Sequence, residues 1–442
     1  MLEKKIAANT LYQIITKLST SASVFIITIL IARNLGTQGY GQYTKITAFI
    51  SMFYLLVDFG LNAIFLQLSQ KEALARRLLA LRLVLSLLIV ALVNLLILIL
   101  PFSQTQDIGF SPNLRPASFI FSLTIISQAI ILSATAIFQK KLRYDLYMYS
   151  TISGTLLTLG LIFLFSRNHA PLEYILLSYI LGGALSALAS LLFLKEKTAG
   201  SIIPNKKPVI LNLSKDLLKI DLKFSRELLK DSLPLGLMLF FNLVYFRIDI
   251  IILSFYKNTT DVALYGYAYK YFEFLLAIPL FLSNAVYPFL LRSLKNLRSY
   301  YEFCQKYLLL FLLLSLPIFI LAWILAPAIA IVKNDFAPSI FILRILLLSL
   351  PIFFLTNILQ WILIARNKKT YLLKIYIIGA IVNIVLNLIF IPSYGYIAAV
   401  IITAASETLI LIFLISKFIS LKSQDLSFHH SREGGNLGQS ND

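Results

Sequence analysis

Long hydrophobic runs separated by short polar stretches make up most of this 442-residue sequence. A helix needs about 20 mostly apolar residues to cross the hydrocarbon layer of a bilayer. About twelve runs are long enough, and a polar interval divides them into six and six. The predicted spans are Leu11–Ala32, Ile46–Leu66, Leu83–Leu100, Ala117–Phe138, Tyr147–Phe165, Tyr174–Leu194, Ser232–Phe255, Tyr271–Leu290, Tyr307–Val332, Ile340–Leu363, Tyr371–Ile391 and Ile397–Ile415.

Runs of this length predict helices, because the strands of a membrane barrel alternate in polarity over about 10 residues. We therefore predict an all-α polytopic membrane protein with two six-helix lobes. The N-terminal lobe covers residues 1–195, a cytoplasmic linker 196–231, the C-terminal lobe 232–421 and a disordered cytoplasmic tail 422–442. The linker pattern fits either an amphipathic surface helix or a solvated connector. A faint echo relates the halves: Gly39–Lys45 and Leu264–Lys270 both place Tyr-Gly at the same distance before a lysine.

The charge distribution predicts topology rather than a nucleic-acid partner. The formal net charge is +19, and charged residues are 13% of the chain. With a cytoplasmic N-terminus, roughly 28 of the Lys and Arg residues fall in cytoplasmic segments and about seven in outer ones. We expect both termini in the cytoplasm and the protein in the cytoplasmic membrane. The single cysteine, Cys304, cannot form an intrachain disulfide, and the three histidines suggest no metal site or cofactor.

Charged residues inside the predicted spans are costly and are functional candidates by default. They are Lys17, Asp58, Arg247, Asp249, Glu273, Arg344, Lys374 and Glu407. Glu273 and Lys374 lie within a turn of an interface, and for these two residues we favour snorkelling over a functional role. For the deeper residues the alternative is a structural ion pair, for which Lys17 and Asp58 are at matching depth.

Polar side chains also form stripes at helical spacing on the first, seventh, eleventh and twelfth spans. Such stripes can form hydrogen bonds that hold membrane helices together. Four of them in two similar halves, however, favour a polar central cavity. Cations there suit a phosphate headgroup, whereas buried carboxylates could carry a coupling proton or Na⁺. The substrate-binding candidates are Lys17, Arg33, Arg247, Arg344, Asn383 and Asn387, and the ion-coupling candidates are Asp58, Asp249, Glu273 and Glu407.

Enzyme signatures are absent from the sequence. It contains no Gly-x-x-x-x-Gly-Lys-Ser/Thr, Gly-x-Ser-x-Gly, His-Glu-x-x-His or Cys-x-x-Cys motif. We therefore expect a transporter rather than an enzyme, driven by an ion gradient, the membrane potential or the substrate gradient.

Several motifs resemble those of Wzx-type polysaccharide flippases of the multidrug/oligosaccharidyl-lipid/polysaccharide (MOP) exporter superfamily. Residues 31–41, Ile-Ala-Arg-Asn-Leu-Gly-Thr-Gln-Gly-Tyr-Gly, are similar to the family's ARxLGxxxYG, and residues 58–61 match its DFGL. Residues 247–249 with 263–270 are similar to its iD…vGxYxxAxk segment. Residues 383–399 are similar to its NxxlNxxlIPxyGxxGAA, with Ala398 in place of a glycine, and Glu407 matches its sE. Each motif is weak alone, but together they cover nearly the whole chain.

The resemblance implies two six-helix lobes around a central cavity that opens alternately to each side. It also implies translocation of undecaprenyl-pyrophosphate-linked oligosaccharide for O-antigen, capsule or exopolysaccharide synthesis, with cavity cations on the pyrophosphate. The implied partners are this lipid-linked oligosaccharide, membrane lipids, and polysaccharide polymerase or assembly proteins.

Two other readings stay open. One is a multidrug or peptidoglycan-precursor exporter of the same superfamily. The other is a membrane glycosyl polymerase or ligase, which would normally carry a large outer loop with catalytic Arg or His. The longest outer loop here, residues 102–116, is short and disfavours the enzyme.

Overall fold

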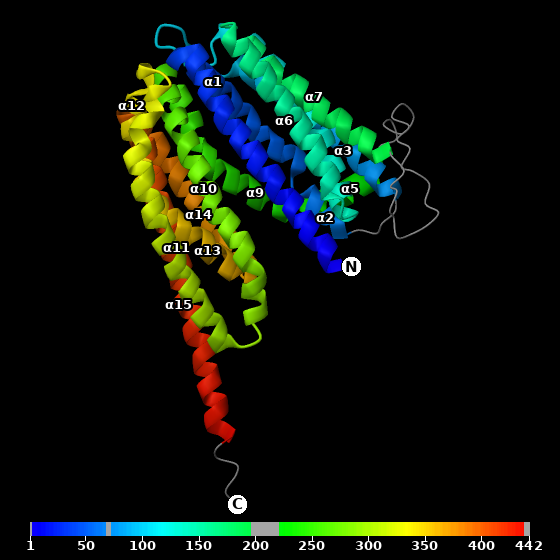
Figure 1. Cartoon of the computed structure of the whole chain (residues 1–442), viewed down its shortest axis with the longest axis vertical. Coiled ribbons are helices and arrows are strands. Elements are labelled where there is room, and N and C mark those ends of the chain that lie inside the picture. The colour runs from blue at the N-terminus through cyan, green and yellow to red at the C-terminus, as the bar shows by residue number, and fades with distance from the viewer. Residues whose placement is uncertain (1, 68–71, 196–220, 437–442) are drawn as a thin grey trace, which may run out of the picture. The chain divides into compact units, whose positions relative to one another are not determined.

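The computed structural model describes residues 2–67, 72–195 and 221–436, and almost all of them are α-helical (Figure 1). The all-α fold expected from the hydrophobic runs is confirmed. Most of the predicted linker, residues 196–220, lies outside the described residues. The helices are α1 Leu2–Asp58, α2 Leu61–Gln67, α3 Glu72–Ile99, α4 Arg115–Ser122, α5 Thr124–Lys140, α6 Tyr144–Arg167, α7 Leu172–Lys195, α9 Leu222–Tyr256, α10 Thr259–Ser293, α11 Leu297–Leu325, α12 Pro338–Leu348, α13 Leu350–Ala365, α14 Lys369–Tyr394 and α15 Tyr396–Asn436.

Short elements fill two of the connections. Strands β1 (Phe102–Ser103) and β2 (Ile108–Gly109) pair antiparallel in the loop after α3, and the 3₁₀ turn η1 (Pro112–Leu114) leads into α4. Two further 3₁₀ turns, η2 (Ala326–Ile331) and η3 (Asn334–Phe336), join α11 to α12. The sequence pattern did not predict the hairpin, because two-residue strands leave no period to detect.

Within the described residues, 10 helices are long and apolar enough to cross a membrane, or up to 11 if the bent pair α12 and α13 counts as one span. The first of them, Ala8–Gln67, has 60 residues. A straight helix of that length would measure about 90 Å, three times the hydrocarbon thickness. It therefore has length for both of the first two predicted spans.

Gly36 divides these two spans. Its backbone has φ 64° and ψ −169°, which lies outside helical geometry. Glycine adopts positive φ without the steric cost that a Cβ imposes. In Figure 1 the blue chain rises from the N end and turns back near the top of α1.

The chain separates into two compact units, Met1–Gly266 and Tyr267–Asp442. The division falls within α10, so α9 groups with the first unit, and the lobe boundaries given above stay a prediction. Helix α9 begins ten residues before the expected span start at Ser232. Asp221 caps it by accepting a 3.0 Å hydrogen bond from the Phe224 amide, and its carboxylate lies 2.8 Å from Arg77 of α3.

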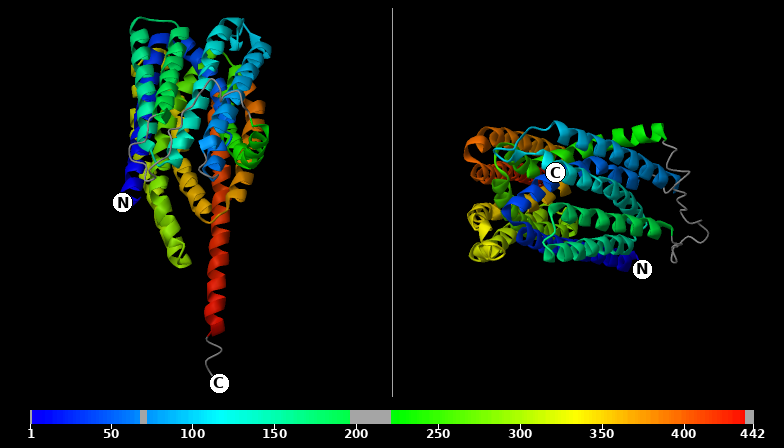
Figure 2. Two further views of the ribbon diagram at one scale, coloured as in Figure 1. Left: turned by 90° about the vertical axis from the view of Figure 1, so that its right-hand side faces the viewer. Right: turned by 90° about the horizontal axis from the view of Figure 1, so that it is seen from above.

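The first unit has a core where the ends of six helices meet. Leu61 and Phe65 of α2 pack with Leu78 of α3, Phe138 of α5 and Leu228 of α9, all nearly inaccessible to solvent. Helices α6 and α7 run side by side in the same unit (Figure 2). Burial of these apolar groups holds α9 against the helices that precede the linker.

The two echoing Tyr-Gly segments contact one another within the first unit. A Cβ on Gly41 would lie 2.1 Å from the backbone oxygen of Thr259, the first residue of α10. A Cβ on Gly266 would lie 2.6 Å from Cγ2 of Thr44. The glycines therefore allow α1 and α10 to approach at both places, as small residues do at membrane helix interfaces.

The second unit is built on α11, α13 and α15, which pack through buried rings such as Phe311 and Phe354. Helix α15 continues to Asn436, so the segment predicted to be disordered is helical up to that residue. In Figure 2 its red C-terminal part projects beyond the α10–α11 turn. Asp425 ties it to the unit, accepting hydrogen bonds from Arg366 Nη2 at 2.5 Å and from the Tyr301 hydroxyl.

Gly41→Ala should destabilise the protein by roughly 1–3 kcal/mol, because a backbone oxygen cannot move aside as a side chain does. Gly160→Ala is the matched control, since no atom lies within 4 Å of its would-be Cβ. The measurement is the thermal unfolding midpoint of each purified variant in one detergent. An equal midpoint for both variants would show that the Gly41–Thr259 contact is not tight in solution.

Candidate functional site

Asp58, one of the candidate charges of the first unit, forms an ion pair with an arginine. Arg82 of α3 donates a 2.9 Å hydrogen bond from Nη2 to Oδ1 of Asp58, at the end of α1. The Arg82 side chain is fully buried, whereas that of Asp58 is 26% exposed. Lys17 is exposed on α1, so the ion pair suggested between Lys17 and Asp58 is wrong. Arg82 was missed because it lies just before a predicted span, where a lysine or arginine usually snorkels.

Asp58 is the last residue of α1, directly before the break that separates α1 from α2. Phe59 and Gly60, which follow it, have φ of 39° and 73°. Leu235 of α9 fills the space beside Gly60, with its Cγ 3.0 Å from the position of a Cβ there. The break between α1 and α2 therefore places the Asp58 carboxylate against α3 and leaves part of it accessible.

Asp249 is the second buried carboxylate of this unit. It lies in α9, is 3% exposed, and accepts a hydrogen bond from the hydroxyl of Tyr265 in α10. Its Oδ1 also accepts a 2.7 Å hydrogen bond from the Ile250 amide. Arg247 is half-buried on the same helix. The buried Asp249 carboxylate therefore links α9 to α10 through the Tyr265 hydroxyl.

Glu407 is the buried carboxylate of the second unit. It lies in α15, is 4% exposed, and accepts a hydrogen bond from the hydroxyl of Thr356 in α13. Tyr376 of α14 donates a 3.0 Å hydrogen bond to Gln360 of α13. Three helices therefore contribute polar groups to this part of the unit.

Asn383 and Asn387 lie one turn apart on α14 and are almost fully buried. Asn387 Nδ2 donates to Oδ1 of Asn383 at 2.9 Å, and Asn383 Nδ2 donates to Ser406 Oγ of α15 at 3.2 Å. The Asn387 Oδ1 is buried and has no hydrogen-bond partner within the described part of the chain. The two amides therefore join α14 to α15.

The remaining candidates are Glu273, Arg33 and Arg344. Glu273 pairs with Lys270 on α10 at 2.9 Å, and both side chains are partly exposed, as the snorkelling alternative anticipates. Arg33 is exposed on α1. Arg344 of α12 lies with its Cζ 5.4 Å from the centre of the Trp323 ring.

Lys45 is a buried charge that sequence reasoning missed. It was counted among the outer-loop lysines, yet it is 1% exposed. Its Nζ donates to Thr259 Oγ1 at 2.6 Å and to the backbone oxygens of Asp107 and Gly109 at 3.1 and 3.4 Å. Lys45 therefore joins α1, the β1–β2 hairpin and the start of α10. The one feature of the sequence that could have pointed to Lys45 is the lysine that follows Tyr-Gly in both halves.

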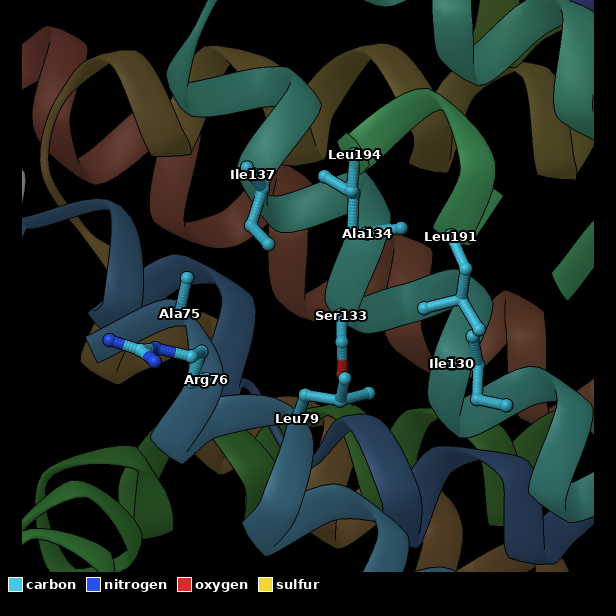
Figure 3. Close-up of a pocket in the computed structure, with 9 residues that line it drawn as sticks. All are labelled: Ala75, Arg76, Leu79, Ile130, Ser133, Ala134, Ile137, Leu191 and Leu194. Atoms are coloured by element: carbon cyan, nitrogen blue, oxygen red, sulfur yellow. The ribbon is translucent and has the colours of Figure 1, made fainter. Parts of the chain in front are cut away.

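A depression in the first unit, about 260 Å³ in empty volume and partly open, lies between α3, α5 and α7. Figure 3 shows its lining, in which Leu79 and Leu191 lie beside Ser133 and the guanidinium of Arg76 is directed away from the depression. It contains none of the ten candidate residues. Among the residues that the structure describes, no group of three or more His, Cys, Asp and Glu side chains could hold a metal ion.

Two family models match parts of this chain. A family model described as "Polysaccharide biosynthesis protein" matches residues 6–294, which is more than half of the sequence. The chain belongs to the polysaccharide biosynthesis protein family. A second model, described as "MatE", matches residues 234–389. No curated protein sequence matches the chain.

Solved structures show the same fold. A lipid II flippase MurJ in an inward closed conformation aligns with a TM-score of 0.72 at 16% identity, covering 92% of this chain and 87% of the other. An inward-facing multidrug resistance MATE transporter of the MOP superfamily aligns at 0.71 and 14% identity, covering 91% and 96%. A MATE structure in complex with MaL6 aligns at 0.53 and 13% identity, covering 91% and 97%. The predicted membership of the MOP superfamily, with its two-lobe helical fold, is confirmed.

Asp58→Asn should destabilise this family member more than Arg82→Gln does. The first change leaves a fully buried guanidinium without its carboxylate, whereas the second leaves a carboxylate that is 26% exposed and can reach water. We expect about 3 kcal/mol for the first and about 1 kcal/mol for the second. Thermal unfolding of the purified variants measures both.

The double variant should be less destabilised than the sum of the single changes, because the pair is removed as a unit. Lys17→Gln is the control, and its effect should add to that of Asp58→Asn. The Asp58–Arg82 pairing would be contradicted if the destabilisation by Asp58→Asn added to that of Arg82→Gln but failed to add to that of Lys17→Gln.

Proposed function

We propose that this protein translocates undecaprenyl-pyrophosphate-linked oligosaccharide across the cytoplasmic membrane for cell-surface polysaccharide synthesis. The observation that carries the proposal is the polysaccharide biosynthesis family match over residues 6–294. The motifs similar to Wzx-type flippases, from residue 31 to Glu407, support it along the rest of the chain. The fold shared with a lipid II flippase is consistent with a lipid-linked substrate.

The substrate's chemistry fits the candidate cations. A pyrophosphate carries oxygens that Arg and Lys bind with charge-assisted hydrogen bonds. Lys17 and Arg33 are exposed and Arg247 is half-buried, so we assign them the substrate-contacting role. Asn383 and Asn387 stay substrate-binding candidates in this proposal, although both are almost fully buried between α14 and α15.

We further propose that transport is coupled to an ion through Asp249 or Glu407. Both carboxylates are almost fully buried in helices long and apolar enough to span a membrane, and each accepts a hydrogen bond from a hydroxyl of a neighbouring helix. Ionisable groups buried in membrane helices commonly serve as carriers of a proton or a small cation. Asp58 is a weaker candidate, since Arg82 already compensates it. Glu273 is weaker for the same reason, through Lys270.

The positive-inside distribution places both termini in the cytoplasm in this proposal. Polysaccharide polymerase and assembly proteins would then receive the translocated lipid on the outer side. A second candidate function is export of drugs or of the peptidoglycan precursor. It is favoured by the MatE match over residues 234–389 and by the lipid II flippase fold.

Asp249→Asn should lower surface glycan display about tenfold or more in cells where this protein is the sole flippase, because an amide cannot take up the coupling ion. Tyr265→Phe is the matched change, since it removes the hydrogen bond and keeps the carboxylate. It should retain most display. Arg247→Ala should impair display while the protein still reaches the membrane.

The readouts are surface glycan by immunoblot and flippase abundance in isolated membranes. If Asp249→Asn and Tyr265→Phe lost the same amount of surface glycan at equal flippase abundance, the role of Asp249 and Tyr265 would be a structural hydrogen bond only. Full display with Asp249→Asn would remove Asp249 from the coupling step.

A further inference from the structure

Arg344 differs from the buried carboxylates described above, because no acidic residue or hydrogen-bond acceptor in the described part of the chain meets its guanidinium. Its Nε is buried and without a hydrogen-bond partner there. The contact that it makes is with the ring of Trp323 on α11, 5.4 Å from Cζ to the ring centre. A ring face attracts a cation, but it accepts no directional hydrogen bonds from the five donors of a guanidinium.

The surroundings of Arg344 are exposed and apolar. Phe341 and Leu348 flank it on α12, one turn before and one turn after, and each is 57% exposed. Beside Trp323 on α11, Ile320 and Ile324 are 54% and 66% exposed. In helices that span a membrane, such a surface faces lipid. The guanidinium therefore lies in a seam between α11 and α12 that opens towards lipid.

The depth of this seam suits a lipid headgroup. Arg344 is six residues from Pro338, where α12 begins, which is about 9 Å along the helix axis. Trp323 lies two residues before the end of α11 at Leu325. Tryptophan concentrates at membrane interfaces, and a long cationic side chain reaches towards the headgroups.

We propose that the Arg344–Trp323 seam binds the phosphate of an anionic phospholipid in the leaflet next to the α11–α12 connection. A guanidinium presents its donors as a planar fork that matches phosphate oxygens. The exposed side chains of Ile320 and Phe341 would contact the acyl chains. A net anionic lipid is favoured over a zwitterionic one, since no protein carboxylate in the described chain neutralises Arg344. For Arg344 this role takes the place of the substrate-cavity role expected from the sequence.

The test is native mass spectrometry of the full-length protein in detergent, titrated with phosphatidylglycerol and, in parallel, with phosphatidylcholine. The wild type should retain one more tightly bound phosphatidylglycerol than Arg344→Gln. The affinity of that site should fall about tenfold or more in the variant, as loss of a charge-assisted contact implies. Arg344→Lys should keep part of the affinity, because it keeps the charge without the fork. Trp323→Leu should weaken the site several-fold.

Lys374→Gln is the control, because Lys374 is also an exposed cation near a span end, on α14. It should leave phosphatidylglycerol retention unchanged. Equal retention by wild type and Arg344→Gln would overturn the proposal, as would an equal loss in Lys374→Gln. Displacement of the bound lipid by equimolar undecaprenyl pyrophosphate would assign the seam to the transport substrate instead. Unfolding midpoints in the same detergent verify folding, and Arg344→Lys decides the matter if Arg344→Gln unfolds.

Discussion

Polar groups inside the hydrocarbon layer have to find their partners within the chain, and the rest of this structure depends on that constraint. Lipid tails neither donate nor accept hydrogen bonds, so the backbone folds into helices that satisfy themselves. Several buried side chains follow the same rule. Lys45 is buried, and it is held by Thr259 and two carbonyl oxygens of the β1–β2 loop. That contact joins three parts of the first unit that are far apart in the sequence, and the close approaches at Gly41 and Gly266 make room for it.

The same constraint separates structural charges from candidates for transport. Arg82 compensates Asp58 with a full opposite charge, so this pair is best explained as a brace between α1 and α3. Asp249 and Glu407 are almost fully buried and accept hydrogen bonds from the hydroxyls of Tyr265 and Thr356. Arg344 finds a ring and no anion in the described chain, so its counter-charge is expected from the bilayer. Burial distinguishes the carboxylates as well, because the side chain of Asp58 is 26% exposed, whereas Asp249 and Glu407 are 3% and 4% exposed.

The positions of the membrane helices were predictable, because hydrophobic length is a property of the chain itself. The side chains that pair between different helices were not predictable from the sequence. The sequence places Lys17 and Asp58 at matching depth, yet Lys17 is exposed on α1 and Asp58 pairs with Arg82. Periodicity cannot show which helix lies opposite, and a lysine close to a span end gives the same pattern whether it snorkels or, like Lys45, is buried. The repeated Tyr-Gly was visible as an echo, but its contact with Thr44 and Thr259 depends on tertiary packing.

The central claim is that this family member moves a lipid-pyrophosphate oligosaccharide between leaflets. Its most direct test is the leaflet accessibility of such a lipid in proteoliposomes that contain this protein alone, with and without a pH or Na⁺ gradient. The account predicts protein-dependent translocation that one of the two gradients accelerates. No translocation of any lipid-pyrophosphate oligosaccharide, together with efflux of a soluble organic cation from the same vesicles, would contradict it and assign the protein to drug export.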